Sequence, residues 1–327
     1  MQKPLHLVFK FPKNLITLDD DSESDKINEH IKFLKHKPRV IWGQDSSRFT
    51  SGVAKKNRDR ILDQIKNEIN TYTFFLETNR GKRELYVGKM TNIYDIGDIT
   101  PESSLLQYIP DFYIPLISIP NVFVEVMTIF KIDSTSVTNI IIESTRENIL
   151  SAKRNSVFLV NINEELEKLL NELLSNPEVN FQYQVEQEDV PDDVTVDDQP
   201  KDKPSRTSGS GTSSYKRDSK TSKKAIVLVD YLCEIDPSHE DFISKVTKEN
   251  YVEAHHLIPM EFQDDFKKSI DVEANIVSLC VGCHKKLHHA EHAGIEPLIE
   301  KLYFDRIDRL KDCDIELTRE KLLSYYK

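Results

Sequence analysis

The first half of the chain carries its apolar residues in short runs that are typical of strands. Residues 72–76 and 84–90 are rich in β-forming side chains, and the composition of residues 79–82 predicts a turn between them. Two stretches have helical spacing instead, an isoleucine-bearing one at residues 55–70 and a leucine-rich one at residues 164–174. We expect further strands at residues 122–132, 138–142 and 156–161. The pattern predicts an α+β, β-barrel-like domain over residues 1–184.

Residues 185–223 lose this periodicity. Residues 186–202 carry eight acidic side chains and one lysine, whereas residues 203–224 carry seven basic side chains and one aspartate. Residues 208–214 contain only serine, glycine and threonine. This composition predicts a disordered linker. Much of the net charge of −11 therefore lies in the linker, and a basic strip precedes the C-terminal domain.

Residues 224–327 are expected to form a second domain that contains a strand–strand–helix unit. Residues 251–256 alternate around β-forming side chains, residues 275–279 predict a second strand, and helical character begins at Val281. Seven of the ten histidines and three of the four cysteines of the chain lie in residues 233–292. This concentration indicates metal binding, since histidines that merely pack in a core would be more scattered.

The histidines fall at the ends of these predicted elements. His255 and His256 are adjacent at the end of a strand, so their side chains are expected on opposite faces. His284 and His288 are four residues apart on one face of the predicted helix. Together with His255 they form a three-ligand set with an open coordination position, which is typical of a catalytic metal ion.

Five residues in this order resemble the motif of the HNH, or ββα-metal, endonucleases: His255, His256, Asn275, His284 and His288. The resemblance implies that His255, His284 and His288 hold a divalent ion, which magnesium, manganese, nickel or zinc would suit. It also implies that His256 is the general base and that Asn275 holds the loop that orients His256. The interval between His256 and Asn275 is long for the family and suggests an inserted loop at residues 261–271. The alternative is a small zinc-stabilised fold whose remaining histidines are surface residues.

A second metal site is predicted from the cysteines. Cys280 and Cys283 have the two-residue separation with which thiolates hold zinc from a tight turn. Cys233 is the expected third ligand and His239 the fourth, because residues 237–238 can turn the chain back, with Asp236 as the competing fourth ligand. Such a zinc would supply much of the folding free energy of a small domain. The alternative is that the two cysteines form a reduced loop without metal.

The N-terminal half has a weaker resemblance, of pattern alone. The order of one helix and several strands over residues 38–162 resembles the EVE and PUA-like barrels, which in bacterial restriction proteins read modified bases flipped into an aromatic pocket. The resemblance implies that a base-stacking cage would be drawn from aromatic residues of these strands, namely Trp42, Tyr72, Phe74 and Tyr86. The alternative for each of these four is core packing, the usual place of aromatic residues on strands.

Hydrophobicity and cysteine content indicate the cellular compartment. No apolar run approaches the ~18 residues of a membrane span, and the N-terminus lacks the apolar core of a signal peptide, so we expect a cytoplasmic protein without a membrane partner. Three cysteines with metal spacing favour a reducing compartment, and Cys313 is expected to take no part. Helices predicted at residues 295–310 and after Thr318 are expected to cover the zinc fold; the alternative is a homodimer contact.

These features predict a metal-dependent HNH DNA endonuclease with a structural zinc. The N-terminal resemblance extends this to a modification-dependent restriction enzyme in defence against phage DNA. A non-catalytic, zinc-bearing nucleic-acid-binding adaptor is one alternative. The other is a nuclease effector whose N-terminal domain binds a protein partner.

Overall fold

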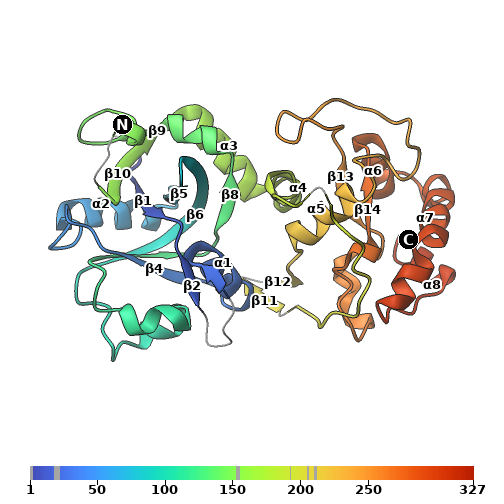
Figure 1. Cartoon of the computed structure of the whole chain (residues 1–327), viewed down its shortest axis with the longest axis horizontal. Helices are drawn as coiled ribbons and strands as arrows, with labels where there is room; N and C mark the ends of the chain where they lie inside the picture. The colour runs from blue at the N-terminus through green and yellow to red at the C-terminus, as the bar shows by residue number, and fades with distance from the viewer. Residues whose placement is uncertain (1–2, 18–22, 152–154, 192, 205, 210–211) are drawn as a thin grey trace. The chain divides into compact units, whose positions relative to one another are not determined.

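The computed structural model of the chain describes residues 3–17, 23–151, 155–191, 193–204, 206–209 and 212–327. It has a mixed α+β fold that divides into two compact units, unit 1 (Met1–Ser175) and unit 2 (Asn176–Lys327) (Figure 1). The division lies before the predicted boundary at residue 184, because helix α4 (Pro177–Gln187) packs in unit 2. Its Phe181 and Val185 side chains contact Ala254 and Ile276 in one buried cluster.

Unit 1 is built on an eight-stranded sheet with the order β4-β7-β6-β5-β1-β10-β9, and β8 pairs with β6. Its strands are β1 (His6–Pro12), β4 (Val40–Gln44), β5 (Tyr72–Asn79), β6 (Lys82–Tyr94), β7 (Val122–Val126), β8 (Phe130–Ile132), β9 (Ile140–Ile142) and β10 (Val157–Ile162). Strands β1 and β5 are parallel, and the other pairs are antiparallel. Strands β2 (Leu15–Thr17) and β3 (Glu23–Asp25) form a separate hairpin.

The prediction of a barrel-like sheet is corrected by the strand order. Strands β4 and β9 are the two ends of the sheet, and within the described residues they do not pair with each other. The α+β class is confirmed, but the sheet is open. Strand candidates can be recognised from local pattern, whereas closure depends on a pairing between segments that lie far apart in sequence.

The helices of unit 1 are α1 (Lys26–His36), α2 (Lys55–Lys66) and α3 (Glu164–Ser175). Short 3₁₀ turns lie at η1 (Ser104–Tyr108), η2 (Asp111–Leu116), η3 (Ser134–Asn139) and η4 (Ile149–Ser151). Helix α2 ends four residues before the predicted end at residue 70, because the backbone reaches a positive φ of 59° at Glu68. The predicted turn at residues 79–82 is present, with positive φ at both Arg80 and Gly81, as a tight two-residue hairpin requires.

Unit 2 contains the predicted strand–strand–helix unit. Strands β13 (Glu253–His256) and β14 (Ile276–Leu279) pair antiparallel, and α6 (Val281–His289) follows. The other elements are β11 (Arg206–Gly209), β12 (Thr212–Tyr215), α5 (Ser219–Val227), η5 (Met260–Asp265), η6 (Glu273–Asn275), α7 (His292–Asp312) and α8 (Arg319–Ser324). Thr318 caps α8 through its side chain, as predicted.

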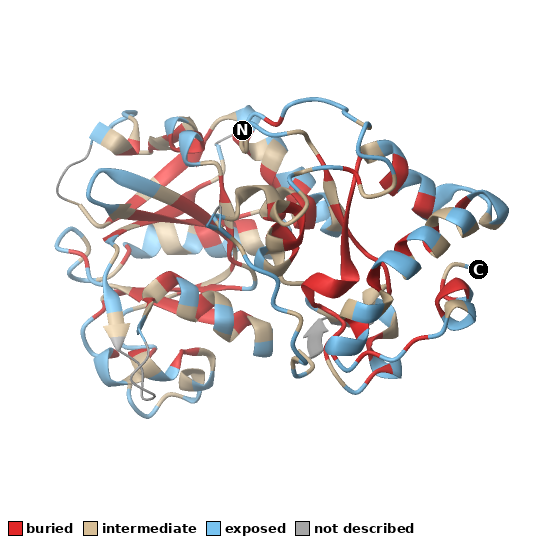
Figure 2. Ribbon diagram, turned by 45° about the vertical axis from the view of Figure 1, so that its right-hand side comes forward, coloured by how far each residue is buried: buried red, intermediate tan, exposed pale blue. Residues whose placement is uncertain are grey.

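The last two helices complete the core of unit 2. Leu302 and Leu310 of α7 and Leu322 of α8 join Leu257 and Val277 in one buried cluster. The helices therefore pack on their own domain, as expected. Buried residues, red in Figure 2, follow the strands and the inner faces of the helices in both units. Among the helices that the structure describes, none has the length and apolar character of a membrane span.

The acidic part of the predicted linker belongs to unit 2 and contacts distant segments of that unit. Asp198 accepts two hydrogen bonds from the Arg309 guanidinium, at 2.7 and 3.0 Å. The backbone carbonyl of Lys201 accepts a hydrogen bond from Ser269 N at 2.9 Å. Composition does not reveal these partners, because they lie far away in sequence.

Candidate metal centres

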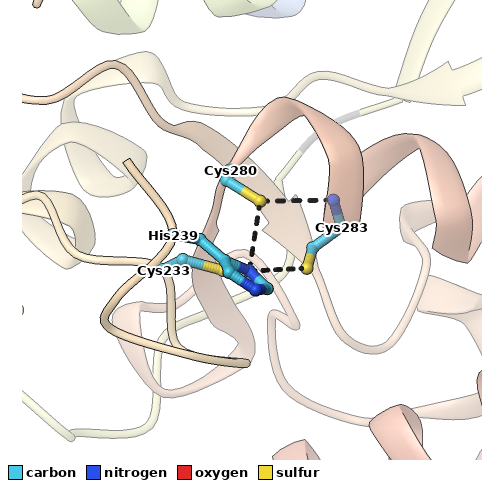
Figure 3. Close-up of side chains that lie close together, drawn as sticks. All are labelled: Cys233, His239, Cys280 and Cys283. Carbon is cyan, nitrogen blue, oxygen red and sulfur yellow. Dashed lines mark hydrogen bonds between the residues drawn. The ribbon is translucent and has the colours of Figure 1, made fainter. Parts of the chain in front are cut away.

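One cluster joins three cysteines and a histidine (Figure 3). Cys280 is the N-cap of α6 and Cys283 lies in its first turn, whereas Cys233 follows α5 and His239 lies in the loop after it. One ligand atom from each of the four residues lies within 4.8 Å of the others. His239 Nδ1 is 3.6 Å from Cys280 Sγ and 3.4 Å from Cys283 Sγ. These are the four residues that the sequence predicts for a zinc site.

The donor set fits a structural zinc ion. A tetrahedral ion with a Zn–N bond of ~2.0–2.1 Å and Zn–S bonds of ~2.3 Å places its nitrogen and sulfur ligands about 3.6 Å apart. His239 Nδ1 lies 3.6 and 3.4 Å from the two sulfur atoms, which fits this spacing. Burial and the neighbouring Cys280 thiol raise the pKa of Cys283, and burial also raises the pKa of Cys280. Against the effect of burial, hydrogen bonds from the backbone and from His239 lower the pKa of Cys233. A zinc ion between the three sulfur atoms would stabilise all of them as thiolates.

The fourth ligand is settled by geometry. The Nδ1 atom of His239 faces the thiols, while its Nε2 atom lies 3.6 Å from Asp236 Oδ2. Asp236 therefore contacts the far side of the ring and lies outside the cluster. Cys313 is fully buried in the hydrophobic core of unit 2 and also lies outside it, as expected.

The second cluster consists of His255, His284 and His288, the three residues predicted for the divalent ion. Their ligand atoms lie within 4.8 Å of one another, and His284 Nε2 is 3.1 Å from His288 Nε2. Burial, and then the neighbouring His284 and His288, hold the pKa of His255 well below its ordinary value. His255 is thus neutral, the state in which an imidazole binds a metal. His288 is exposed, so the cluster is open to solvent on that side.

Two residues absent from the sequence-based predictions orient these ligands. His284 Nδ1 lies 2.5 Å from Glu253 Oε2, so the proton is held on Nδ1 and the Nε2 lone pair faces His288. His255 Nε2 lies 3.0 Å from the Tyr326 hydroxyl, which itself donates to Leu257 O at 2.8 Å. Partners of this kind fix the tautomer and the orientation of metal-binding histidines.

His256, the predicted general base, is paired with a carboxylate. Its Nε2 atom lies 2.8 Å from Asp271 Oδ1, and both side chains are buried. The nitrogen left to accept a proton is therefore Nδ1. Asp271 belongs to the loop that the sequence marks as an insertion, and only the fold brings it to His256.

Asn275 bridges the chain segments next to His256 and Asp271 through three hydrogen bonds. Its amide nitrogen donates to Ile258 O at 3.0 Å and to Ile270 O at 2.8 Å, and its oxygen accepts from Ile258 N at 2.8 Å. Ile258 lies two residues after His256, and Ile270 directly precedes Asp271. One buried side chain thus connects the two chain segments that carry the base and its carboxylate.

All four histidines line one open cleft of about 370 Å³. Arg217 and Glu178 line it as well, with Arg217 Nη1 2.7 Å from Glu178 Oε2. The Arg217 guanidinium also lies over the Phe181 ring, 3.8 Å from its centroid. His256 is only 5% exposed, and it is one of the residues that line this cleft. In the sequence, Arg217 stands out only as part of the basic strip at residues 203–224. The sequence does not predict that it lies in the cleft.

The four aromatic residues predicted for a base-stacking cage are buried in unit 1. Trp42, Tyr72 and Phe74 are at most 1% exposed and Tyr86 is 8% exposed. Trp42 packs against Phe75 with ring centroids 4.6 Å apart. This burial is what the alternative of core packing predicts.

No protein-family model matches the chain, and no curated protein matches it. The interpretation of the two clusters therefore rests on their geometry and chemistry.

Proposed function

We propose that the protein is a metal-dependent DNA endonuclease of the HNH type, with its active site in unit 2. One observation carries the proposal. The three convergent imidazoles and His256, which is paired with Asp271, line the same cleft beside an arginine. A structural zinc site needs only four ligands, which the cysteine cluster already supplies.

Each residue has a role in phosphodiester hydrolysis. A divalent ion held by His255, His284 and His288 would neutralise charge on the phosphate and on the leaving oxygen. His256 Nδ1 takes the proton of the attacking water. Asp271 holds the ring of His256 in the required tautomer and stabilises the imidazolium that forms, as in other histidine–carboxylate pairs. Arg217 offers a planar cation to a phosphate oxygen.

Unit 1 is proposed as the domain that recognises nucleic acid, so that the whole chain would act as a modification-dependent restriction enzyme against phage DNA. The burial of its four candidate aromatics counts against a base-stacking cage. The second proposal for unit 1 is that it binds a protein partner and the chain is a nuclease effector. Binding of the intact His256→Ala protein to modified and unmodified duplexes separates the two.

The test of the nuclease uses the full chain with unmodified, methylated and hydroxymethylated DNA and several divalent ions. We expect cleavage that requires a metal, and a fall of about 10²–10⁴-fold in rate for His256→Ala and for Asp271→Asn. Both variants should retain zinc and a cooperative thermal transition, although each disrupts a buried hydrogen bond and should lower the stability of unit 2. Undiminished cleavage by folded His256→Ala would remove the proposed base. Absence of cleavage under every condition would favour the non-catalytic, zinc-bearing adaptor.

A further inference from the structure

A second pocket, in unit 1, is lined by cationic side chains. It has a volume of about 270 Å³ and lies at the β5–β6 hairpin. Its lining comprises Lys10, Leu76, Thr78, Gly81, Lys82, Arg83 and Leu150. Three of these seven residues are basic and none is acidic, although the chain as a whole has a net charge of −11. The proposed function leaves this pocket without a role.

Strand register explains why the charges gather there. Lys10 of β1 pairs with Leu76 of β5, and Arg83 of β6 pairs with Thr78 two residues further on. Residues two apart on a strand share a face, so Lys10 and Arg83 lie on the same face of the sheet. Lys82 is one residue out of step with Arg83, so register alone does not bring it to this face; it lines the pocket from the tight turn, where Gly81 has a φ of +91°.

The carboxylates of the same hairpin point away from this pocket. Glu77 pairs with Glu84 across the same two strands, and this pair is adjacent to the pair of Thr78 and Arg83. Because successive residues of a strand point to opposite faces, both carboxylates lie on the face opposite Arg83. There they have cations of their own. Lys13 Nζ is 3.5 Å from Glu77 Oε2, and Lys131 Nζ is 3.0 Å from Glu84 Oε1. The two carboxylates of the hairpin thus lie on the face opposite Lys10 and Arg83.

The pocket is suited to an anion that can be approached from solvent. Lys82 and Arg83 are exposed, and no atom lies within 4 Å of the space that a side chain at Gly81 would occupy. Burial and then the charge of Arg83 lower the pKa of Lys10, a repulsion that a bound anion would relieve. A guanidinium and two ammonium groups together match the tetrahedral oxygens of a phosphate.

We propose that this pocket binds backbone phosphates of nucleic acid and is the surface by which unit 1 holds DNA. This inference deepens the proposed function and rests on it for the identity of the partner. A nucleic-acid backbone is chosen over a free nucleotide because the described residues of the lining include no aromatic ring on which a base could stack.

The test measures binding to a short labelled duplex by fluorescence anisotropy at several salt concentrations. It uses the full chain carrying His256→Ala, without divalent metal, so that cutting does not interfere. For each phosphate that the variant Lys82→Gln/Arg83→Gln no longer neutralises, binding should weaken about eightfold at ~0.1 M salt. The slope of log affinity against log salt should also fall by about 0.9 for each such phosphate.

A matched control removes the same charge elsewhere in unit 1. Lys56→Gln/Lys66→Gln changes two exposed lysines of α2, and we expect it to bind as the parent does. Equal weakening in both variants, or none in the pocket variant, would overturn the proposal. A further arm adds a mononucleotide or inorganic phosphate as competitor. If either binds the parent protein and depends on Lys82 and Arg83 while the duplex does not bind, the ligand is a free phosphate and the backbone proposal fails.

The outcome is distinguishable from failure of the nuclease proposal. Pocket-dependent binding in a chain that never cuts DNA would refute the nuclease and keep the pocket. If the protein cuts DNA in the presence of metal but its binding to the duplex does not depend on Lys82 and Arg83, the pocket proposal is refuted and the nuclease proposal is kept.

Discussion

The substitution Asn275→Ala tests whether one amide holds the proposed base and its carboxylate together. It would leave three backbone groups without their present partners, the N–H and C=O of Ile258 and the C=O of Ile270. Asn275, Ile258 and Ile270 are all fully buried. A buried polar group that loses its partner costs about 1–3 kcal/mol, so three cost at least about 3 kcal/mol. That is a large part of the ~5–15 kcal/mol by which domains are stable.

The assay can follow the two units separately. Trp42 is the only tryptophan and is buried in unit 1, so its fluorescence reports that unit. Release of zinc from the cysteine cluster, followed with a colorimetric chelator during denaturation, reports unit 2. We expect Asn275→Ala to lower the unfolding free energy of unit 2 by about 3 kcal/mol or more, with the Trp42 transition unchanged.

Asn275→Asp is the companion variant. It can still accept from Ile258 N but loses both donors and places a carboxylate against two carbonyl oxygens, so it should destabilise unit 2 as well. A loss below about 1 kcal/mol in both variants would refute the reasoning, because a single net hydrogen bond is worth that much.

Three further predictions follow from the metal clusters and the buried histidines. Tyr326→Phe removes the hydroxyl that contacts His255 and should weaken metal binding at the histidine cluster about 10–100-fold, as measured by competition titration, with zinc retained at the cysteine cluster. A strong chelator should unfold unit 2, because structural zinc contributes about 10–16 kcal/mol, and circular dichroism that does not change after zinc is removed would count against a structural role. Burial lowers the pKa of His6 and of His30 to about 3, so the folded state keeps both neutral while the unfolded state protonates below its pKa of 6.5. Unit 1 should therefore lose stability as pH falls from about 6.5 toward 3, by up to ~1.4 kcal/mol per pH unit for each histidine. Glu77, whose pKa burial raises to about 7, offsets part of this loss, and Trp42 fluorescence in denaturant at several pH values measures the sum.

The sequence alone determined those features that depend on local spacing. The four-residue interval of His284 and His288 places both on one helical face, and the two-residue interval of Cys280 and Cys283 brings two thiols to one turn. These intervals have nearly the same geometry in any fold. The same holds for the hairpin turn at residues 79–82 and for the capping of α8 by Thr318.

Only the tertiary structure decided which distant groups meet. Asp271 contacts His256, Tyr326 contacts His255, and Glu253 contacts His284 across 15, 71 and 31 residues. It also placed His239, and not Asp236, among the thiols. Among the described strands, β4 and β9 do not pair with each other. Hydrophobic periodicity records which side of an element is buried. It does not record which element lies opposite, because that depends on the packing of the whole domain.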